Sequence, residues 1–188
     1  MSQLCAQSIK HLCNFKVHVP MIQPFSDQKH VVNGKSWGLS AASYDIRIAH
    51  DLVLGPDPAK LLSRMMRSEP YADKAMEVFR EAVTDLPPSF ALAHSIEDFN
   101  IPNDVVGYVC DKSTYARVMV SAFNTLFDPG FRGNATLELV NLGDQIVEIK
   151  AGDPICQIAF HWLDAATDRP YNGKYQHQPK RPVPAIHE

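Results

Sequence analysis

Apolar and polar residues alternate along several short stretches of the chain, which is the pattern of strands with one buried face. The clearest stretch covers residues 135–140, where apolar residues at 135, 137 and 139 alternate with Thr136, Glu138 and Val140. Further strands are predicted at Phe90–Ser95, Val105–Cys110, Thr136–Asn141, Ile146–Ile149 and Ile155–Trp162, with a short edge strand at Lys16–Pro20. Turn signals separate them at Leu142–Asp144 and Ala151–Pro154. Many short strands between turns predict a mainly β domain, either a sandwich, a jelly roll or a barrel.

Two regions break the strand pattern with the spacing of helices. Residues 2–15 predict a short amphipathic helix, because apolar side chains recur at three- and four-residue steps. Residues 60–66 are helix-like, and an apolar stripe over residues 71–82 predicts a second helix after Pro70. We expect the first helix to pack on the core, and the stripe over residues 71–82 to serve packing or a subunit contact.

The strand predicted at Ser43–Ile48 places Asp45 and Arg47 on one face. Such a pair is either solvated or bridges to another subunit. The first is the simpler interpretation.

Composition narrows the class of protein. The chain has 188 residues, 45% of them hydrophobic, and a formal net charge of −3. This size fits one domain over residues 1–188, and the charge gives no broad basic surface for nucleic acid. No apolar run reaches membrane-spanning length. The four cysteines are scattered without metal-ligand spacing, so we expect free thiols in a cytoplasmic protein that binds neither nucleic acid nor membrane.

Candidate chemistry begins at Asp128-Pro-Gly, a turn that leads into the strand carrying Glu138. A carboxylate in mid-strand is either solvated or held in a partly dry pocket, where burial raises its pKa. Upstream, Asp111–Arg117 predicts a helix start with Ser113 and Thr114 as hydroxyl caps beside Lys112. Ser113 and Arg117 are four residues apart and would share a helix face.

The C-terminal segment at residues 169–188 is too polar and too rich in proline to form a core element. It is either a frayed tail or a lid that orders over an anionic ligand.

Three motifs in one order resemble the dCTP deaminase family of the dUTPase superfamily. They are Ser113-Thr-Tyr-Ala-Arg117, Asp128-Pro-Gly-Phe-Arg-Gly-Asn-Ala-Thr-Leu-Glu-Leu139 and Arg169-Pro-Tyr-Asn-Gly-Lys-Tyr-Gln176. Weaker similarity covers residues 43–47 and 90–102. The resemblance implies a distorted jelly-roll or β-barrel dUTPase-like fold with a few short helices, assembled as a homotrimer with active sites between subunits.

The resemblance also implies hydrolytic deamination of dCTP to dUTP without zinc, and the zinc deaminase signature is absent from this sequence. Glu138 would be the general base, while Ser113 and Arg117 would hold the water and polarise the site. No metal ligands are expected in the protein, and Mg²⁺ would arrive with the triphosphate. The implied substrate-binding residues are Lys112, Ser113, Thr114, Asn124, Asp128, Phe131, Thr136, Tyr171, Lys174, Gln176 and Gln178.

One segment departs from the family pattern. Residues 118–127 are about two residues shorter than usual and lack the Thr-Ala-Gly-like run, which bears on the water geometry and the nucleobase pocket. Two alternatives therefore remain open. The first is a dUTP pyrophosphatase or a bifunctional deaminase, and the second is a nucleotide-binding regulator without hydrolysis.

Overall fold

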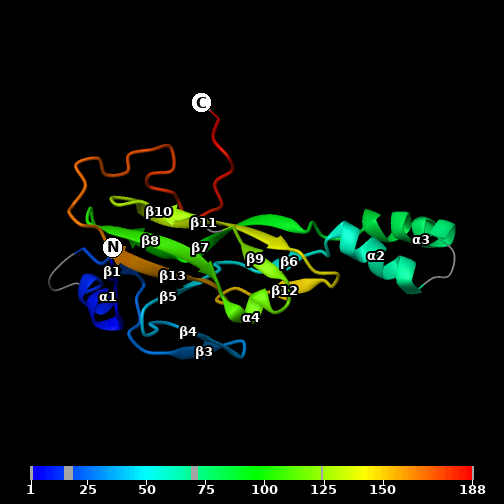
Figure 1. Cartoon of the computed structure of the whole chain (residues 1–188), viewed down its shortest axis with the longest axis horizontal. Helices are drawn as coiled ribbons and strands as arrows, with labels where there is room; N and C mark the ends of the chain where they lie inside the picture. Colours follow the sequence, from blue (N-terminus) through cyan, green and yellow to red (C-terminus); the bar gives the residue numbers. More distant parts are fainter. Residues whose placement is uncertain (1, 15–18, 69–71, 124, 188) are drawn as a thin grey trace.

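Two antiparallel sheets form the body of the molecule. The computed structural model describes residues 2–14, 19–68, 72–123 and 125–187 (Figure 1). The first sheet runs in the order β1 (Ser2–Gln3), β13 (Pro154–Trp162), β8 (Val105–Asp111), β10 (Leu126–Phe127), with β5 (Tyr44–Arg47) also paired to β13. The second runs in the order β2 (Ile22–Gln23), β7 (Phe90–Asn100), β11 (Arg132–Asn141), β9 (Val120–Ala122). An isolated bridge between Ile48 and Ser95 joins the two sheets.

Two small hairpins complete the β structure. They are β3 (His30–Val32) with β4 (Lys35–Trp37), and β6 (Leu52–Leu54) with β12 (Val147–Ile149). Asn33 and Gly34 form the turn of the first hairpin at positive φ, as the Asn-Gly pair favours. The mainly β class predicted from the alternation is confirmed.

The inward side chains of both sheets form one hydrophobic core. Ile46, Ile158 and Phe160 enter it from the first sheet, and Phe99 and Leu139 from the second. All five are fully buried, and each such side chain contributes about 1.5–3 kcal/mol through burial. This core fixes which face of each strand is left for chemistry.

β11 carries the alternation that the sequence predicts. Its residues 135, 137 and 139 are buried, whereas Thr136, Glu138 and Val140 are partly exposed on the opposite face. Glu138 lies directly across from Leu92 on β7. The strand is longer than predicted, since it begins at Arg132, directly after the Asp128-Pro-Gly turn.

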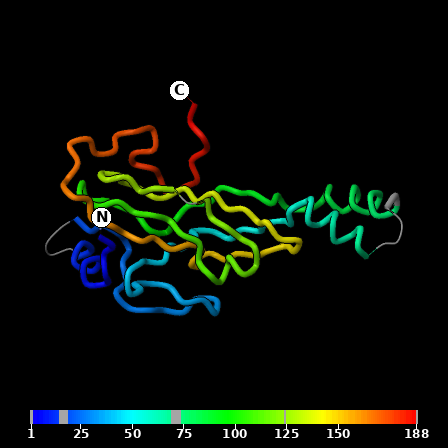
Figure 2. The backbone as a smooth tube through the Cα atoms, viewed as in Figure 1, coloured from blue at the N-terminus to red at the C-terminus, as the bar shows by residue number. Residues whose placement is uncertain are grey.

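The described part of the chain has four helices, and two of them form a protruding hairpin. The helices are α1 (Ala6–Leu12), α2 (Pro58–Ser68), α3 (Ala72–Thr84) and α4 (Ser113–Ala116). α2 and α3 pack on each other and extend away from the β body (Figures 1 and 2). Asp57 caps α2 by accepting hydrogen bonds from the backbone N–H groups of Ala59 and Lys60. Among the described residues, no helix is long and apolar enough to cross a membrane.

Three local predictions need correction. The helix expected over residues 2–15 is shorter, because residues 2 and 3 pair with β13 instead. Ser113 and Thr114 do not cap α4; the N-cap is Lys112, with no side-chain cap hydrogen bond. The edge strand expected over Lys16–Pro20 falls mostly outside the described residues.

The prediction that Asp45 and Arg47 form a solvated ion pair is wrong. Asp45 is buried and accepts hydrogen bonds from Lys29 and Lys112, each at 2.7 Å. Arg47 instead donates to the buried carboxylate of Glu97 at 2.7 Å and stacks on Trp37. Both faces of β5 are covered, so the alternation in its sequence did not mark a solvent face.

Candidate active site

A cavity of about 500 Å³ opens beside the outer face of β11. Glu138 and Thr136 project into it from this strand, and Leu92 adds an apolar wall from β7. The complete lining is Phe90, Leu92, Thr125, Leu126, Phe127, Asp128, Phe131, Ala135, Thr136, Glu138, Tyr171, Tyr175, Gln178, Val183 and Ala185. The lining is thus mostly apolar with a few polar groups, which is typical of small-molecule sites.

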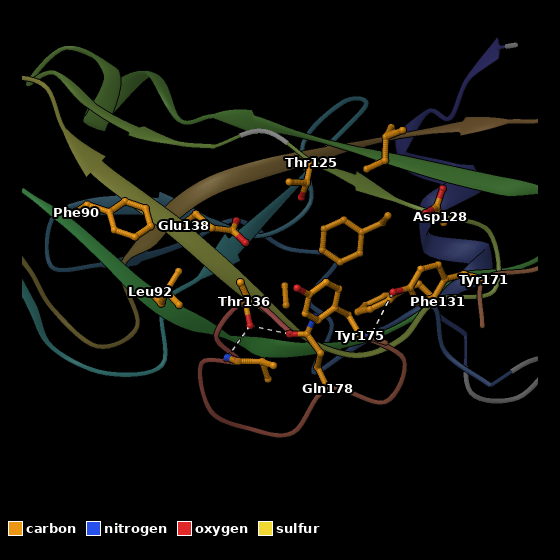
Figure 3. Close-up of a pocket in the computed structure, with 15 residues that line it drawn as sticks. Phe90, Leu92, Thr125, Asp128, Phe131, Thr136, Glu138, Tyr171, Tyr175 and Gln178 are labelled. Atoms are coloured by element: carbon orange, nitrogen blue, oxygen red, sulfur yellow. Dashed lines mark hydrogen bonds between the residues drawn. The ribbon is translucent and has the colours of Figure 1, made fainter. Parts of the chain in front are cut away.

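The polar groups are spread along the cavity (Figure 3). Glu138 lies at one end beside Phe90 and Leu92, while Asp128 lies at the other end near Tyr171. Two carboxylates at opposite ends suit a ligand that presents different polar groups at each end.

Glu138 has the environment of a general base. Its side chain is half-buried, and among the described residues only its own backbone N–H donates to its carboxylate. Burial in the apolar lining raises its pKa above the ordinary value for glutamate. A carboxylate that lacks a cationic partner and is partly desolvated is a better proton acceptor than one held in an ion pair.

The C-terminal segment is docked on the Asp128-Pro-Gly turn and on the start of β11. The backbone N–H of Tyr171 donates to the carbonyl of Pro129 at 2.7 Å, and that of His177 donates to the carbonyl of Arg132 at 2.8 Å. Gln176 joins the two by accepting from the Arg132 N–H and donating to the Gly130 carbonyl. In Figure 2 the segment runs along one side of the β body before the chain ends.

Two glycines of the Asp-Pro-Gly-Phe-Arg-Gly run permit this docking. A Cβ at Gly133 would lie 2.5 Å from the backbone nitrogen of Gln178, and one at Gly130 would lie 2.6 Å from the Pro170 side chain. Both glycines have positive φ, which other residues rarely adopt. The motif therefore shapes the surface on which the C-terminal segment lies.

Thr136 connects the docked segment to the cavity. Its hydroxyl donates to Gln178 Oε1 at 2.7 Å and accepts from the backbone N–H of Val183 at 3.0 Å. Tyr175 also lines the cavity, and its hydroxyl accepts from the backbone N–H of Ile186. One wall of the cavity is thus formed by Tyr175, Gln178 and Val183, which come about 40 positions after Glu138 in the sequence.

Of the predicted site residues, Glu138, Asp128, Phe131, Thr136, Tyr171 and Gln178 line this one cavity. Gln176 is outside the lining and hydrogen-bonds to Gly130 and Arg132, whereas Lys174 is exposed and donates to the Ile186 carbonyl. Asn124 lies outside the described residues.

The other predicted group lies on and next to α4. None of Lys112, Ser113, Thr114 and Arg117 lines the cavity described above. Ser113 and Arg117 are exposed, and Lys112 is paired with Asp45. One chain therefore presents the predicted residues as two separate groups.

Sequence reasoning missed several residues of the cavity wall. Phe90 and Leu92 could have been found, since they alternate with Ala91 and Ala93 in a predicted strand and so share one face. Val183 and Ala185 could not, because no pattern in the C-terminal segment shows which of its residues turn toward β11. Within the described part of the chain, no three His, Cys, Asp or Glu side chains gather into a metal-binding group.

Comparison with known proteins agrees with the resemblance. The dCTP deaminase-like family model matches residues 5–163. A dCTP deaminase of Campylobacter hominis is 35% identical over 172 residues, which cover 89% of this chain and 89% of that protein. A dCTP deaminase of Helicobacter pylori is 33% identical over 170 residues, covering 88% of this chain and 90% of that protein.

Solved structures give a weaker likeness. The native EIAV dUTPase covers 78% of this chain and 92% of its own, with a TM-score of 0.47 and 12% identity. A mutant dUTPase from phage phi11 of S. aureus, described with a structural Mg(II) ion, has a TM-score of 0.47 and 14% identity, covering 81% of this chain and 95% of its own. Likenesses at this level carry no argument about chemistry. The family match spans most of the sequence, and the chain belongs to the dCTP deaminase-like family.

Proposed function

We propose that this protein hydrolyses dCTP to dUTP and ammonia, with Glu138 as general base. The observation that carries the proposal is the half-buried carboxylate of Glu138, which has no cationic partner among the described residues and faces an apolar cavity. The relatives named above are dCTP deaminases, and this chain matches them over nearly their whole length.

The reaction needs a base because water is a poor nucleophile at neutral pH. Glu138 accepts a proton from the water as its oxygen bonds to C4 of cytosine, which gives a tetrahedral intermediate. The proton then passes to the exocyclic nitrogen, the bond from C4 to that nitrogen breaks, and ammonia leaves. The proton of the new C4 hydroxyl moves to N3, which leaves the carbonyl and the N3–H of uracil. The products are dUTP and ammonia, so one water is consumed in each turnover.

The cavity suggests how the nucleoside is oriented. The cytosine would lie at the Glu138 end, between the apolar walls that Phe90 and Leu92 contribute. The deoxyribose would then lie toward Asp128, whose carboxylate can accept a hydrogen bond from the 3′-hydroxyl. Magnesium belongs to the substrate in this proposal, since the triphosphate carries it into the site.

The two separate groups of predicted residues suggest a site between subunits. Ser113 and Arg117 are exposed and lie outside the cavity of their own chain. In a homotrimer, the Ser113 and Arg117 of the partner subunit would face Glu138 and complete the site. Closed three-fold symmetry would create three equal sites from one kind of interface.

The C-terminal segment, residues 169–188, would act as a lid over the nucleotide. Tyr171, Tyr175 and Gln178 already form one wall of the cavity, and backbone hydrogen bonds hold the segment in place. Lys174 lies outside the cavity wall, so contact with the phosphates would require it to leave the Ile186 carbonyl. We expect the enzyme to act in the cytoplasm, where its four free thiols would stay reduced.

The test is to incubate the purified protein with dCTP and Mg²⁺ and to resolve nucleotides and ammonia over time. dUTP and ammonia in equal amounts support the proposal. Ammonia together with dUMP and pyrophosphate would indicate the bifunctional enzyme. Turnover of dUTP alone would indicate a pyrophosphatase, and tight binding of dCTP without any product would indicate a regulator.

A further inference from the structure

The short helix α4 is held by contacts outside itself. It has four residues, too few to be stable alone, and its N-cap makes no side-chain hydrogen bond. Its position is nevertheless important, because Ser113 begins it and Arg117 follows it. Both side chains are exposed, so neither fixes the helix to the protein.

Tyr115 is the one residue of α4 that is buried. Its hydroxyl donates to the carboxylate of Asp153 at 2.6 Å, a short bond of the charge-assisted kind. Asp153 itself is fully buried in the turn before β13. The turn before β13 therefore anchors α4 through the Tyr115 hydroxyl.

Asp153 is a well-prepared acceptor. Asn33 and Lys35 each donate to it at 2.9 Å, and the backbone N–H of Lys150 donates at 3.1 Å. Burial opposes its ionisation, but the hydrogen bonds from Tyr115, Asn33 and Lys35 outweigh that effect and lower its pKa. The carboxylate is thus a fixed negative charge that orients its four donors.

Asn33 and Lys35 belong to the hairpin of β3 and β4, which lies beside α4 at the lower edge of the molecule in Figure 1. The ammonium of Lys35 also lies 5.6 Å from the centre of the Tyr115 ring. The β3–β4 hairpin therefore contacts both the Asp153 carboxylate and the Tyr115 ring.

We propose that Tyr115 is a positioning residue for deamination, acting with Asp153 to hold Ser113 and Arg117 in the geometry that the reaction needs. The inference rests on the proposed function, since it assigns Ser113 and Arg117 a part in the reaction. Lys112 has its own anchor in Asp45, so the two ends of the α4 region are held independently. Loss of the Tyr115 anchor should disturb the side that carries Arg117 and leave Lys112 in place.

The test variant is Tyr115→Phe, which removes the hydroxyl and keeps the ring. We expect kcat for dCTP to fall between about ten- and a hundredfold, the range that a small misplacement of a reacting group produces. KM should change less than about twofold, because the cavity wall and Lys112 keep their contacts.

Tyr44→Phe is the matched control. Tyr44 is also buried and its hydroxyl is also hydrogen-bonded, but to Ser26 and Pro24, which lie outside α4. Both variants lose the hydroxyl of a buried tyrosine, so both should unfold at lower temperatures, and Tyr115→Phe at the lower one because its lost bond is charge-assisted. Only Tyr115→Phe should lose kcat. A Tyr115→Phe enzyme with more than half the wild-type kcat, or an equal loss in both variants, would overturn the proposal.

A second variant measures the coupling to Asp153. Asp153→Asn should also lower kcat. The double variant with Tyr115→Phe should be no slower than the slower single variant, because the two substitutions break the same hydrogen bond. Multiplied losses in the double variant would contradict the proposal.

Hydrogen exchange provides a readout that does not need turnover. Amides of residues 113–119 should exchange faster in Tyr115→Phe than in the wild type or in Tyr44→Phe. If the wild type does not deaminate dCTP, the proposed function fails, and unchanged exchange would show that the anchor also fails. A wild type that turns over dCTP, beside a Tyr115→Phe variant unchanged in kcat, would refute the anchor alone.

Discussion

Replacement of Glu138 by glutamine separates the base from the shape of the side chain. Glutamine has nearly the same size and keeps a polar end in the cavity, but it cannot accept a proton from water at neutral pH. Among the described residues only the backbone N–H of Glu138 itself donates to the carboxylate, and the amide oxygen of glutamine can accept that bond, so the exchange leaves no partner unsatisfied. The change should therefore act on the chemical step and not on the fold.

The size of the effect follows from the role. A positioned base contributes about a hundred- to ten-thousandfold to a rate, so kcat of Glu138→Gln should fall by at least about a hundredfold. KM for dCTP should stay within about threefold, since the apolar walls at this end are unchanged.

The pH dependence has a defined sign. Burial raises the pKa of Glu138, so the acid limb of the kcat profile should lie above the range of an exposed glutamate. A carboxyl whose pKa is raised in the folded state stabilises the fold below its unfolded pKa and loses that contribution as pH rises. Glu138→Gln should therefore unfold at a slightly higher temperature than the wild type at pH 8, a sign that the base is held at a cost in stability.

The assay is ammonia release from dCTP across pH 5–9, beside thermal unfolding of both proteins. Near wild-type kcat in Glu138→Gln would refute the assignment of the base. Loss of dCTP binding in proportion to the loss of kcat would show that Glu138 holds the substrate and not the proton.

Three further predictions test the assembly, the lid and the core. Glu138→Gln and Ser113→Ala subunits produced together should regain about a quarter of the wild-type activity, since random pairing in a trimer restores that share of shared sites; no recovery would place each site within one chain. Gly133→Ala should raise KM for dCTP several-fold, because its Cβ would displace Gln178, whereas Gly34→Ala, also at positive φ but facing open space, should not; equal KM values would contradict the lid. Arg47→Met should lower the free energy of unfolding by about 3 kcal/mol, because it strands the buried Glu97 carboxylate. Burial already raises the pKa of Glu97, so this loss should be larger at pH 8 than at pH 5 in urea titrations, and a pH-independent loss would contradict the buried-charge argument.

The sequence predicted the strands whose two faces differ, and it failed where both faces are covered. In β11 the alternation placed Glu138 on the partly exposed face, as the structure shows. In β5 the same pattern led to a solvated Asp45 and Arg47. Instead, Glu97 of β7 neutralises Arg47, and Lys29 and Lys112 neutralise Asp45. Burial on both faces depends on segments that are distant in the sequence, and a local pattern of residues does not show which segments cover a strand.

The hairpin of β3 and β4 shows a signal that was present in the sequence. Asn33-Gly34 between short β-prone runs is a strong hairpin pattern, but no hairpin was predicted at these residues. The partners of Asp153 were less accessible, because Asn33 is 120 residues away from it in the chain. Long-range hydrogen bonds to buried carboxylates have no local pattern.

The candidate site divides in the same way. The motif around the Asp128-Pro-Gly turn located one end of the cavity and the strand that carries Glu138. The docked wall formed by Tyr175 and Val183 required the structure, since tertiary hydrogen bonds fix it.

Deamination of dCTP by Glu138 is tested most directly by following ammonia and dUTP together in a reaction with dCTP, Mg²⁺ and protein freed of transition metals by dialysis against a chelator. The account predicts equal amounts of both products from the wild type and almost none from Glu138→Gln. No ammonia from the wild type, or ammonia only after zinc is added back, would contradict it.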